Sequence, residues 1–304
     1  MTKFTNILNT RILLSGATIL AALALVVGGT FAFFSDTETS NDNTFVAGDI
    51  DLKIDNTSYA LDFNIPGFQG TPTGALVPNP SGTWTPANLT VEKFFNFTDL
   101  KPGDYGEDTI SIHVGSNDAW VCAAAQITSD QDNSITDPED EVGGPAGQDG
   151  TADGDLDSGV TFAFWKDDGD NVYEPVAGTN GVPETIFLQG PLSGLGIQGK
   201  IALADSSGIG PFGTTPILGE STSYIGKMWC YGTLTPGTLV QDGVNTGTPI
   251  TLGTGFTCDG SLIGNIGQTD SVVGDLQFFA VQARNNPTFT CAQSWTPAWP
   301  TPAN

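Results

Sequence analysis

The alternation of short β-forming runs with turn residues constrains the fold of this chain more than any other feature. After residue 32, no window combines the apolar spacing of an amphipathic helix with good helix formers. Instead, β-branched and aromatic residues gather in short runs bounded by Gly, Pro, Asn or Asp. We therefore predict an all-β fold. The expected strands cover residues 49–54, 89–97, 108–114, 119–128, 160–165, 184–188, 221–233 and 271–284.

Side-chain patterns within these runs predict how deeply each strand is buried. In residues 49–54 the apolar side chains of Ile50, Leu52 and Ile54 alternate with charged ones, which is typical of a half-buried strand. Residues 224–231 and 275–284 are expected to be the most buried. The second of these segments carries apolar residues on both faces, and this favours a central position in a β-sandwich.

The N-terminus has the organisation of a secretory signal peptide, which is expected to be helical. A short basic start leads into an apolar stretch from residue 12 to 29, followed by small residues at Thr30 and Ala32. Cleavage is predicted between Ala32 and Phe33. The alternative is a retained membrane anchor, because the apolar run is long for a signal peptide and near the spanning minimum of roughly 17 residues. In both cases the chain is expected to be exported.

The charge of the chain restricts its partners. The formal net charge is −25, and removal of residues 1–32, which hold two basic and no acidic residues, brings it to −27. Nucleic acid is excluded as a partner, because its binding needs clustered cations that displace phosphate counterions. A charge of this size keeps a protein soluble and repels anionic surfaces. It also favours divalent cations or high salt as working conditions, with plain solubility as the alternative.

Four cysteines follow the leader, and an even number in an exported chain favours two disulfides. None of them form a C-x-x-C motif, so neither a zinc ribbon nor a thioredoxin-like redox site is indicated. Three pairings are open. We favour Cys230–Cys258, which would close the irregular loop between them, and Cys122–Cys291, which would join an early strand to the chain end. Their expected role is to staple loops.

The first acidic region, residues 129–159, contains almost no large apolar side chain. It is predicted to be an insertion loop, either disordered or folded around ions. Asp153, Asp155 and Asp157 could converge on one calcium ion if the loop curls, because hard cations take several oxygen ligands. The alternative is a solvated acidic loop.

The second acidic region, residues 164–175, is the stronger candidate for calcium. A strand ending on aromatic residues is followed by the turn Asp-Asp-Gly-Asp-Asn, in which Gly169 can adopt a positive φ at no steric cost. That turn would point several carboxylates inward, and without a metal they would repel one another. The alternative is an ordinary exposed turn. The predicted ligands are Asp167, Asp168, Asp170, the carbonyl of Val172, and Glu174 as a bidentate closing ligand.

Catalytic chemistry is not predicted. The chain has one histidine, His113, within an expected strand, so a zinc site with two histidines cannot form. No G-x-S-x-G elbow accompanies it, and no phosphate-binding loop is present. The aspartates of Gly-rich loops are expected to be solvated, without the raised pKa that a general acid needs. We therefore expect a protein that is not an enzyme.

Two segments carry a family resemblance. GGTFAFFSDTETSNDNTFVAGDIDLKID at residues 28–55 resembles the leader and mature start of the TasA/camelysin family, and NFTDLKPGDYGEDTISIH at residues 96–113 is similar to a turn of that family leading into a strand. The resemblance implies a jelly-roll β-sandwich at the cell surface and a SipW-type signal peptidase as a partner. It also implies matrix fibres in which each subunit passes an N-terminal strand to the next. Some camelysin-like relatives are described as metalloproteases.

The predicted organisation is a signal peptide, 1–32, and one β-sandwich domain, 33–304, ending in a Pro-rich tail, 293–304. Trp295 and Trp299 of the tail are expected to dock on the domain or on another subunit. The membrane would be contacted only through an uncleaved signal segment.

The favoured function is a secreted, self-assembling subunit of extracellular matrix fibres. Residues 33–54 would act as the donor strand, and Phe33, Phe34 and Phe45 would be buried in the neighbouring copy. Such head-to-tail contacts do not close, so they build filaments. The alternative is a monomeric, calcium-stabilised module for adhesion at the cell surface. The two differ in whether residues 33–45 pack on their own chain.

Overall fold

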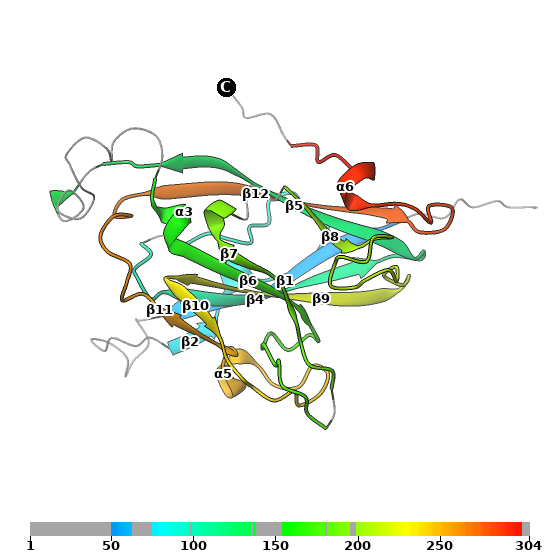
Figure 1. The fold of residues 1–304 in the computed structure, drawn as a ribbon, viewed down its shortest axis with the longest axis horizontal. Helices are drawn as coiled ribbons and strands as arrows, with labels where there is room; N and C mark the ends of the chain where they lie inside the picture. Colours follow the sequence, from blue (N-terminus) through cyan, green and yellow to red (C-terminus); the bar gives the residue numbers. More distant parts are fainter. Residues whose placement is uncertain are drawn as a thin grey trace, which may run out of the picture. The chain divides into compact units, whose positions relative to one another are not determined.

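The computed structural model describes residues 50–62, 75–97, 99–134, 136–137, 154–179, 181–194 and 199–299 (Figure 1). The chain divides into two compact units, residues 1–47 and 48–304, and every described residue belongs to the second. The predicted signal peptide, its cleavage point between Ala32 and Phe33, and the donor-strand residues Phe33, Phe34 and Phe45 lie outside the described residues.

Two antiparallel sheets and a hairpin make up the described fold. The larger sheet has seven strands in the order β2-β1-β4-β9-β6-β7, with β3 also paired to β1. Its strands are β1 Leu52–Asp62, β2 Ala75–Pro78, β3 Trp84–Ala87, β4 Tyr105–Val114, β6 Val160–Asp167, β7 Ile186–Pro191 and β9 Ser221–Tyr231.

The smaller sheet has three strands in the order β12-β5-β8, and β10 and β11 form the separate hairpin. These strands are β5 Ala119–Gln131, β8 Lys200–Ala204, β10 Thr233–Pro236, β11 Phe256–Asp259 and β12 Ser271–Gln282. The described helices are single turns: η1 Pro80–Gly82, α3 Leu156–Gly159, α5 Pro249–Leu252 and α6 Cys291–Ser294. The all-β prediction is confirmed.

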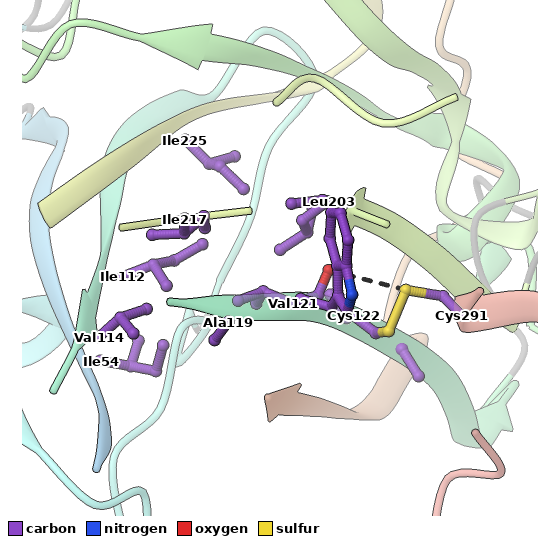
Figure 2. Packing of buried hydrophobic residues seen from close by; sticks show 14 of the residues in the cluster. Ile54, Ile112, Val114, Ala119, Val121, Cys122, Leu203, Ile217, Ile225 and Cys291 are labelled. Atoms are coloured by element: carbon purple, nitrogen blue, oxygen red, sulfur yellow. Dashed lines mark hydrogen bonds between the residues drawn. A yellow bond between two sulfur atoms is a disulfide. The ribbon is translucent and has the colours of Figure 1, made fainter. Parts of the chain in front are cut away.

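The main core lies between the two sheets. Ile54, Ile112 and Ile225 of the larger sheet belong to the same buried cluster as Val121 and Leu203 of the smaller one (Figure 2). Each sheet presents an apolar face to the other, and packing these two faces together removes that surface from water, at about 25 cal/mol per Å². The architecture is therefore a β-sandwich. The alternation predicted for residues 50–54 is also observed, since Ile50 and Leu52 pack on the cluster that contains Ile54.

The opposite face of the larger sheet carries a second core. Trp165 and Met228 are fully buried there and cluster with Tyr173 and Leu234, with Phe256 packed against them. Leu234 and Phe256 come from the β10–β11 hairpin, and Tyr173 comes from the segment after β6. Both faces of strands β6 and β9 are therefore covered, which accounts for the predicted depth of residues 224–231.

One predicted strand and one predicted loop need correction. Residues 89–97 form no strand; Phe94 instead fills the space between the sheets, where its ring contacts those of Trp84 and Phe278. Periodicity cannot separate such an apolar plug from a buried strand. The predicted insertion 129–159 also begins too early, because Ser129–Gln131 extend β5 and pair with β12, and Leu156–Gly159 form α3.

β12 is an edge strand, and the central position predicted for it is wrong. Its residues are mostly half-buried, while its neighbour β5 is central. The apolar residues on its two faces have separate partners. Phe278 faces Phe94 in the sandwich core, whereas Phe279 stacks on Phe289 and on Trp295, at 5.3 Å between ring centroids for the latter pair. The C-terminal segment therefore covers the face of β12 that points away from Phe94.

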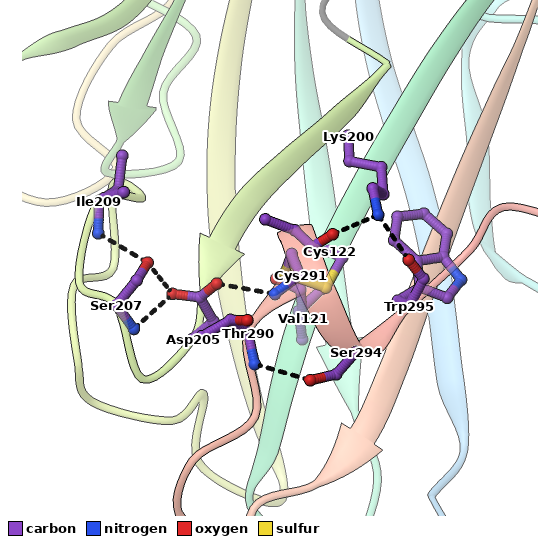
Figure 3. Close-up of a disulfide and its surroundings, with 11 residues drawn as sticks. Val121, Cys122, Lys200, Asp205, Ser207, Ile209, Thr290, Cys291, Ser294 and Trp295 are labelled. Carbon is purple, nitrogen blue, oxygen red and sulfur yellow. Dashed lines mark hydrogen bonds between the residues drawn. A yellow bond between two sulfur atoms is a disulfide. The ribbon is translucent and has the colours of Figure 1, made fainter.

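The cysteine pairs hold this C-terminal segment and the hairpin. Cys122 of β5 is bonded to Cys291 of α6, and Cys230 of β9 to Cys258 of β11, which are the pairings favoured from the sequence. Near the first disulfide, Lys200 Nζ donates to the carbonyl of Trp295 at 2.8 Å, and Asp205 accepts from the backbone N–H of Cys291 at 2.8 Å (Figure 3). Trp295 thus docks on its own domain.

Candidate metal centre

Seven carboxylates gather where β6 ends and the following loop begins. We call them the acidic cluster. Asp167 is the last residue of β6, and the loop beyond it carries most of the others before the chain enters β7. The cluster comprises Glu107, Asp167, Asp168, Asp170, Glu174, Glu184 and Asp242.

The turn after β6 has the backbone conformation predicted from its glycine. Gly169 has a φ of +112°, and Asn171 follows with a φ of +68°. The turn is closed by Asp170, whose Oδ1 accepts from the backbone N–H of Val172 at 3.0 Å. This geometry brings one ligand oxygen from each of Asp167, Asp168 and Asp170 to within 4.8 Å of the others. The three carboxylates predicted to converge therefore do so.

A second group shares Asp170. Oxygens of Asp170, Glu174 and Asp242 also lie within 4.8 Å of one another. Glu174 was predicted to complete the first group, and the structure places it with this second one. Asp242 comes from the segment after β10 and was missed, because no local pattern joins it to residues 70 positions earlier in the chain. Asp170 is the residue common to both groups.

Glu107 is the member of the acidic cluster that lies on strand β4. It pairs with Met228, which in turn pairs with Ala163, so its side chain is on the outer face of the larger sheet with Met228 and Ala163. The residue is fully buried, and neither of its carboxylate oxygens has a hydrogen-bond partner. Burial raises the pKa of Glu107 well above its ordinary value, and the charges of Asp167, Asp108, Asp170 and Glu184 add to that rise.

Glu184 holds the loop in place and contributes a further carboxylate. Its two oxygens accept from the backbone N–H groups of Asp168, at 3.1 Å, and Glu174, at 2.9 Å. Burial, followed by the charge of Asp167, raises the pKa of Glu184 to about 9. Glu184 therefore connects the backbone of Asp168, in the first group, with that of Glu174, in the second.

Burial raises the pKa of the other members as well. It raises the pKa of Asp170 to about 8, with Asp167 and Asp168 adding to the effect. It raises the pKa of Asp167 to about 6, against the hydrogen bond that Thr109 Oγ1 donates to Oδ2 at 2.8 Å. It also raises the pKa of Glu174 to about 6. The sequence had suggested solvated aspartates with ordinary pKa values, and burial beneath the loop overturns that expectation.

The donor set fits a hard divalent cation. All ligand groups of the cluster are carboxylates, which calcium and magnesium prefer, and none is an imidazole or a thiolate. Several oxygens are buried with no hydrogen-bond partner, among them Asp167 Oδ1 and Asp170 Oδ2. Buried polar atoms normally find partners, so these oxygens are available to a cation.

The remaining predicted ligands behave differently. Val172 is fully buried, and its backbone N–H donates to Asp170 Oδ1 at 3.0 Å. Asp153 lies outside the described residues. Asp155 precedes α3 and donates its backbone N–H to Asp270 at 2.6 Å, and Asp157 lies within α3. Within the described part of the chain, neither belongs to a metal-ligating group.

His113 has ordinary partners on the surface of the larger sheet. Its Nε2 lies 2.9 Å from Asp55 on β1, and its Nδ1 lies 3.0 Å from the hydroxyl of Thr222 on β9. Neither partner belongs to the acidic cluster. The single histidine of the chain is therefore a cross-strand partner within the sheet.

The fold and site thus define a disulfide-linked β-sandwich with a carboxylate-lined loop. The model of one protein family, described as camelysin metallo-endopeptidase, matches residues 8–71. This match supports the assignment to the TasA/camelysin family, and at the level of the family it supports a secreted, TasA-like protein. It covers most of the predicted leader and all of β1, while the acidic cluster lies beyond it. Comparison with curated proteins gave no match.

The helices among the described residues were also compared with the length and hydropathy of membrane spans. None of them is long and apolar enough to cross a bilayer.

Proposed function

We propose that this protein is an exported structural subunit that assembles into extracellular fibres by passing its N-terminal strand to a neighbouring copy. The observation that carries the proposal is the family match over residues 8–71, which joins the predicted leader, the donor segment and β1. The predicted donor strand 33–54 is too long at its C-terminal end, because Leu52–Ile54 pair with β4 of the same chain and Ile50 packs on the same core. The exchanged part would therefore end before Ile50. A signal peptidase of the SipW type would release the donor strand by cutting after Ala32.

The sandwich offers edges that suit strand addition. In the described residues, β7 ends one side of the larger sheet, and β12 and β8 border the smaller one. An edge strand presents unpaired backbone N–H and C=O groups, which an extended segment of another chain can satisfy. Phe33, Phe34 and Phe45 would provide the buried side chains of that contact.

The acidic cluster would bind calcium in a structural role. The cation would replace the protons that the buried carboxyls otherwise hold, and it would join the loop after β6 to the segment after β10 through Asp170, Glu174 and Asp242. We assign no catalytic role to the protein, although the family description names a metallo-endopeptidase. The one histidine of the chain cannot provide the two imidazoles of the H-E-x-x-H site that many zinc proteases use.

Electron microscopy of negatively stained protein tests the assembly. We would compare the chain beginning at Phe33 with one beginning at Thr44, each with and without calcium. Filaments that form from the longer chain and vanish on truncation support donor-strand assembly. Monodisperse particles in every sample would overturn it and favour the monomeric, calcium-stabilised adhesion module.

A further inference from the structure

A lysine and an aspartate face each other in the interior of the sandwich. Asp108 of β4 and Lys227 of β9 are directly paired in the register of the larger sheet. Lys227 Nζ lies 3.0 Å from Asp108 Oδ2, and both side chains are 0% exposed. Glu107 is next to Asp108 in the chain, but consecutive strand residues point to opposite faces, so this pair is separate from the acidic cluster.

Aromatic rings enclose the amine and exclude water from it. Lys227 Nζ lies 3.7 Å from the centroid of the Phe95 ring and 5.8 Å from that of Phe94. Its further polar contact is the carbonyl of Phe94 at 3.3 Å. Burial lowers the pKa of Lys227 below its ordinary value, and the charge of Asp108 opposes that effect. The neutral form of the Lys227 amine therefore forms more readily here than that of a lysine at the protein surface.

A third strand holds the carboxyl group in one orientation. Asn56 of β1 is fully buried, and its Nδ2 donates to Asp108 Oδ1 at 3.0 Å. The same nitrogen donates to the carbonyl of Gly82 at 2.6 Å, which fixes the orientation of the amide. Asp108 Oδ1 thus faces a neutral hydrogen-bond donor, while Oδ2 faces the amine.

We propose that Lys227 and Asp108 condense to an intramolecular isopeptide bond. In the neutral pair, with the proton of the ammonium moved to Oδ2, the lone pair of Nζ attacks Cγ of Asp108. Negative charge develops on Oδ1, where Asn56 donates its hydrogen bond, as donors of an oxyanion hole do. Oδ2 then leaves as water with its own proton and one from Nζ. One C–N bond forms, one C–O bond breaks, and no redox partner is required.

The arrangement supplies the positioning that such a reaction needs. Holding an amine and a carboxyl in contact in a dry site replaces a bimolecular encounter and avoids solvent reorganisation. The product is neutral, so it also removes the desolvation cost of keeping two charges buried. The bond would join β4 to β9, two strands in the interior of the larger sheet. A chain locked there would resist unfolding under load, independently of whether it forms fibres.

Mass spectrometry of the full chain, purified after expression, tests the proposal. Trypsin cuts after lysine, so an ordinary Lys227 gives a cut between residues 227 and 228. Trypsin does not cut between Lys101 and Pro102, so Asp108 lies in the peptide 94–166. After reduction of the disulfides, the isopeptide bond would block the cut after Lys227 and leave residues 201–284 joined to residues 94–166. The joined species is expected to weigh one water less than the sum of its two peptides. Ordinary cleavage after Lys227, with no joined species from folded protein, would overturn the proposal.

Variants without Lys227 show whether a loss of one water comes from this bond or from another reaction. Lys227→Met, and the double change Asp108→Leu with Lys227→Met, are expected to remove both the joined peptides and the mass difference. The double variant leaves no lone buried charge, so it serves if the single one fails to fold. Lys53→Met is the matched control, because Lys53 pairs with Asp51 at 2.8 Å on the exposed surface. A water loss that persists in Lys227→Met would assign it to succinimide formation and contradict the proposal.

Discussion

Gly226 of β9 lies against the indole ring of Trp165 on the neighbouring strand β6. The two residues are directly paired, and a Cβ built on Gly226 would meet the ring at 2.0 Å. Trp165 is fully buried and also contacts the rings of Tyr173 and Phe256. Because Gly226 has no side chain, the indole ring of Trp165 fits into the second core, on the face of the larger sheet opposite the sandwich interior.

Gly226→Ala is expected to destabilise the protein by about 1–3 kcal/mol, the usual cost of overpacking a well-filled core. Trp165 cannot move away without disturbing Tyr173 and Phe256. Chemical denaturation measures the change. Gly190→Ala is the matched control in strand β7, because a Cβ there meets nothing within 4 Å. Equal stability of the two variants would show that the Trp165 ring adapts.

Calcium is expected to raise the melting temperature of the protein, by an amount that grows with its concentration. At about one hundred times the dissociation constant, binding adds about 2.7 kcal/mol to the unfolding free energy. Asp170→Asn should abolish most of this effect, because Asp170 belongs to both acidic groups. Asp99→Asn, at an exposed surface pair with Lys101, is the control. A calcium response that survives in Asp170→Asn would place the ion elsewhere.

Glu107→Gln is expected to act in opposite directions with and without calcium. In chelator it should stabilise the protein, because it removes a buried acid whose oxygens have no hydrogen-bond partner. In excess calcium the gain should shrink or reverse, because the substitution removes a negative charge near the bound cation. Thermal unfolding in the two buffers measures this. A loss of stability in chelator as large as that in calcium would show that Glu107 has an unrecognised partner.

The metal-free protein is expected to lose stability as the pH rises. The pKa values of Asp170, about 8, and Glu184, about 9, are above their ordinary values, so the folded state binds protons that the unfolded state releases. Stability is therefore highest near about pH 4 and falls as the pH approaches about 9. Calorimetric scans in chelator at several pH values measure how the unfolding free energy changes with pH. Excess calcium should flatten this dependence, because the cation takes the place of the protons.

The two disulfides are expected to contribute unequally. Cys122 and Cys291 are 169 residues apart, and Cys230 and Cys258 are 28 apart. In the chain-entropy model, opening the longer loop costs about 5 kcal/mol and opening the shorter one about 3–4 kcal/mol. Paired Cys→Ala variants measured by denaturation give the comparison. A larger loss from the shorter loop would mean that enthalpy at the β10–β11 hairpin dominates.

Local patterns in the sequence were sufficient for the strands that bury one face. Ile50, Leu52 and Ile54 alternate with charged residues, and they lie on the core as expected. The positive φ at Gly169 and the convergence of Asp167, Asp168 and Asp170 also follow from a short stretch of chain. These features depend on neighbours within a few residues, and local sequence therefore predicts them.

The incorrect strand predictions concern segments whose packing partners are distant in the sequence. Residues 89–97 have the composition of a strand, but Phe94 fills the gap between two sheets whose spacing depends on many distant residues. The two apolar faces of β12 suggested a central strand, whereas Trp295 from the chain end covers one of them. An apolar face specifies that it must be covered, and it does not specify by what.

The sequence by itself determined an all-β chain with two disulfides, a resemblance to the TasA/camelysin family near its N-terminus and an acidic turn after the β6 strand. Only the tertiary structure decided that Asp242 joins that turn, that Glu107 is buried near it, and that Lys227 faces Asp108 beside Asn56. The physical reason is sequence separation. Strand pairing brings together side chains that lie tens to more than a hundred residues apart, and no local periodicity records which strands become neighbours.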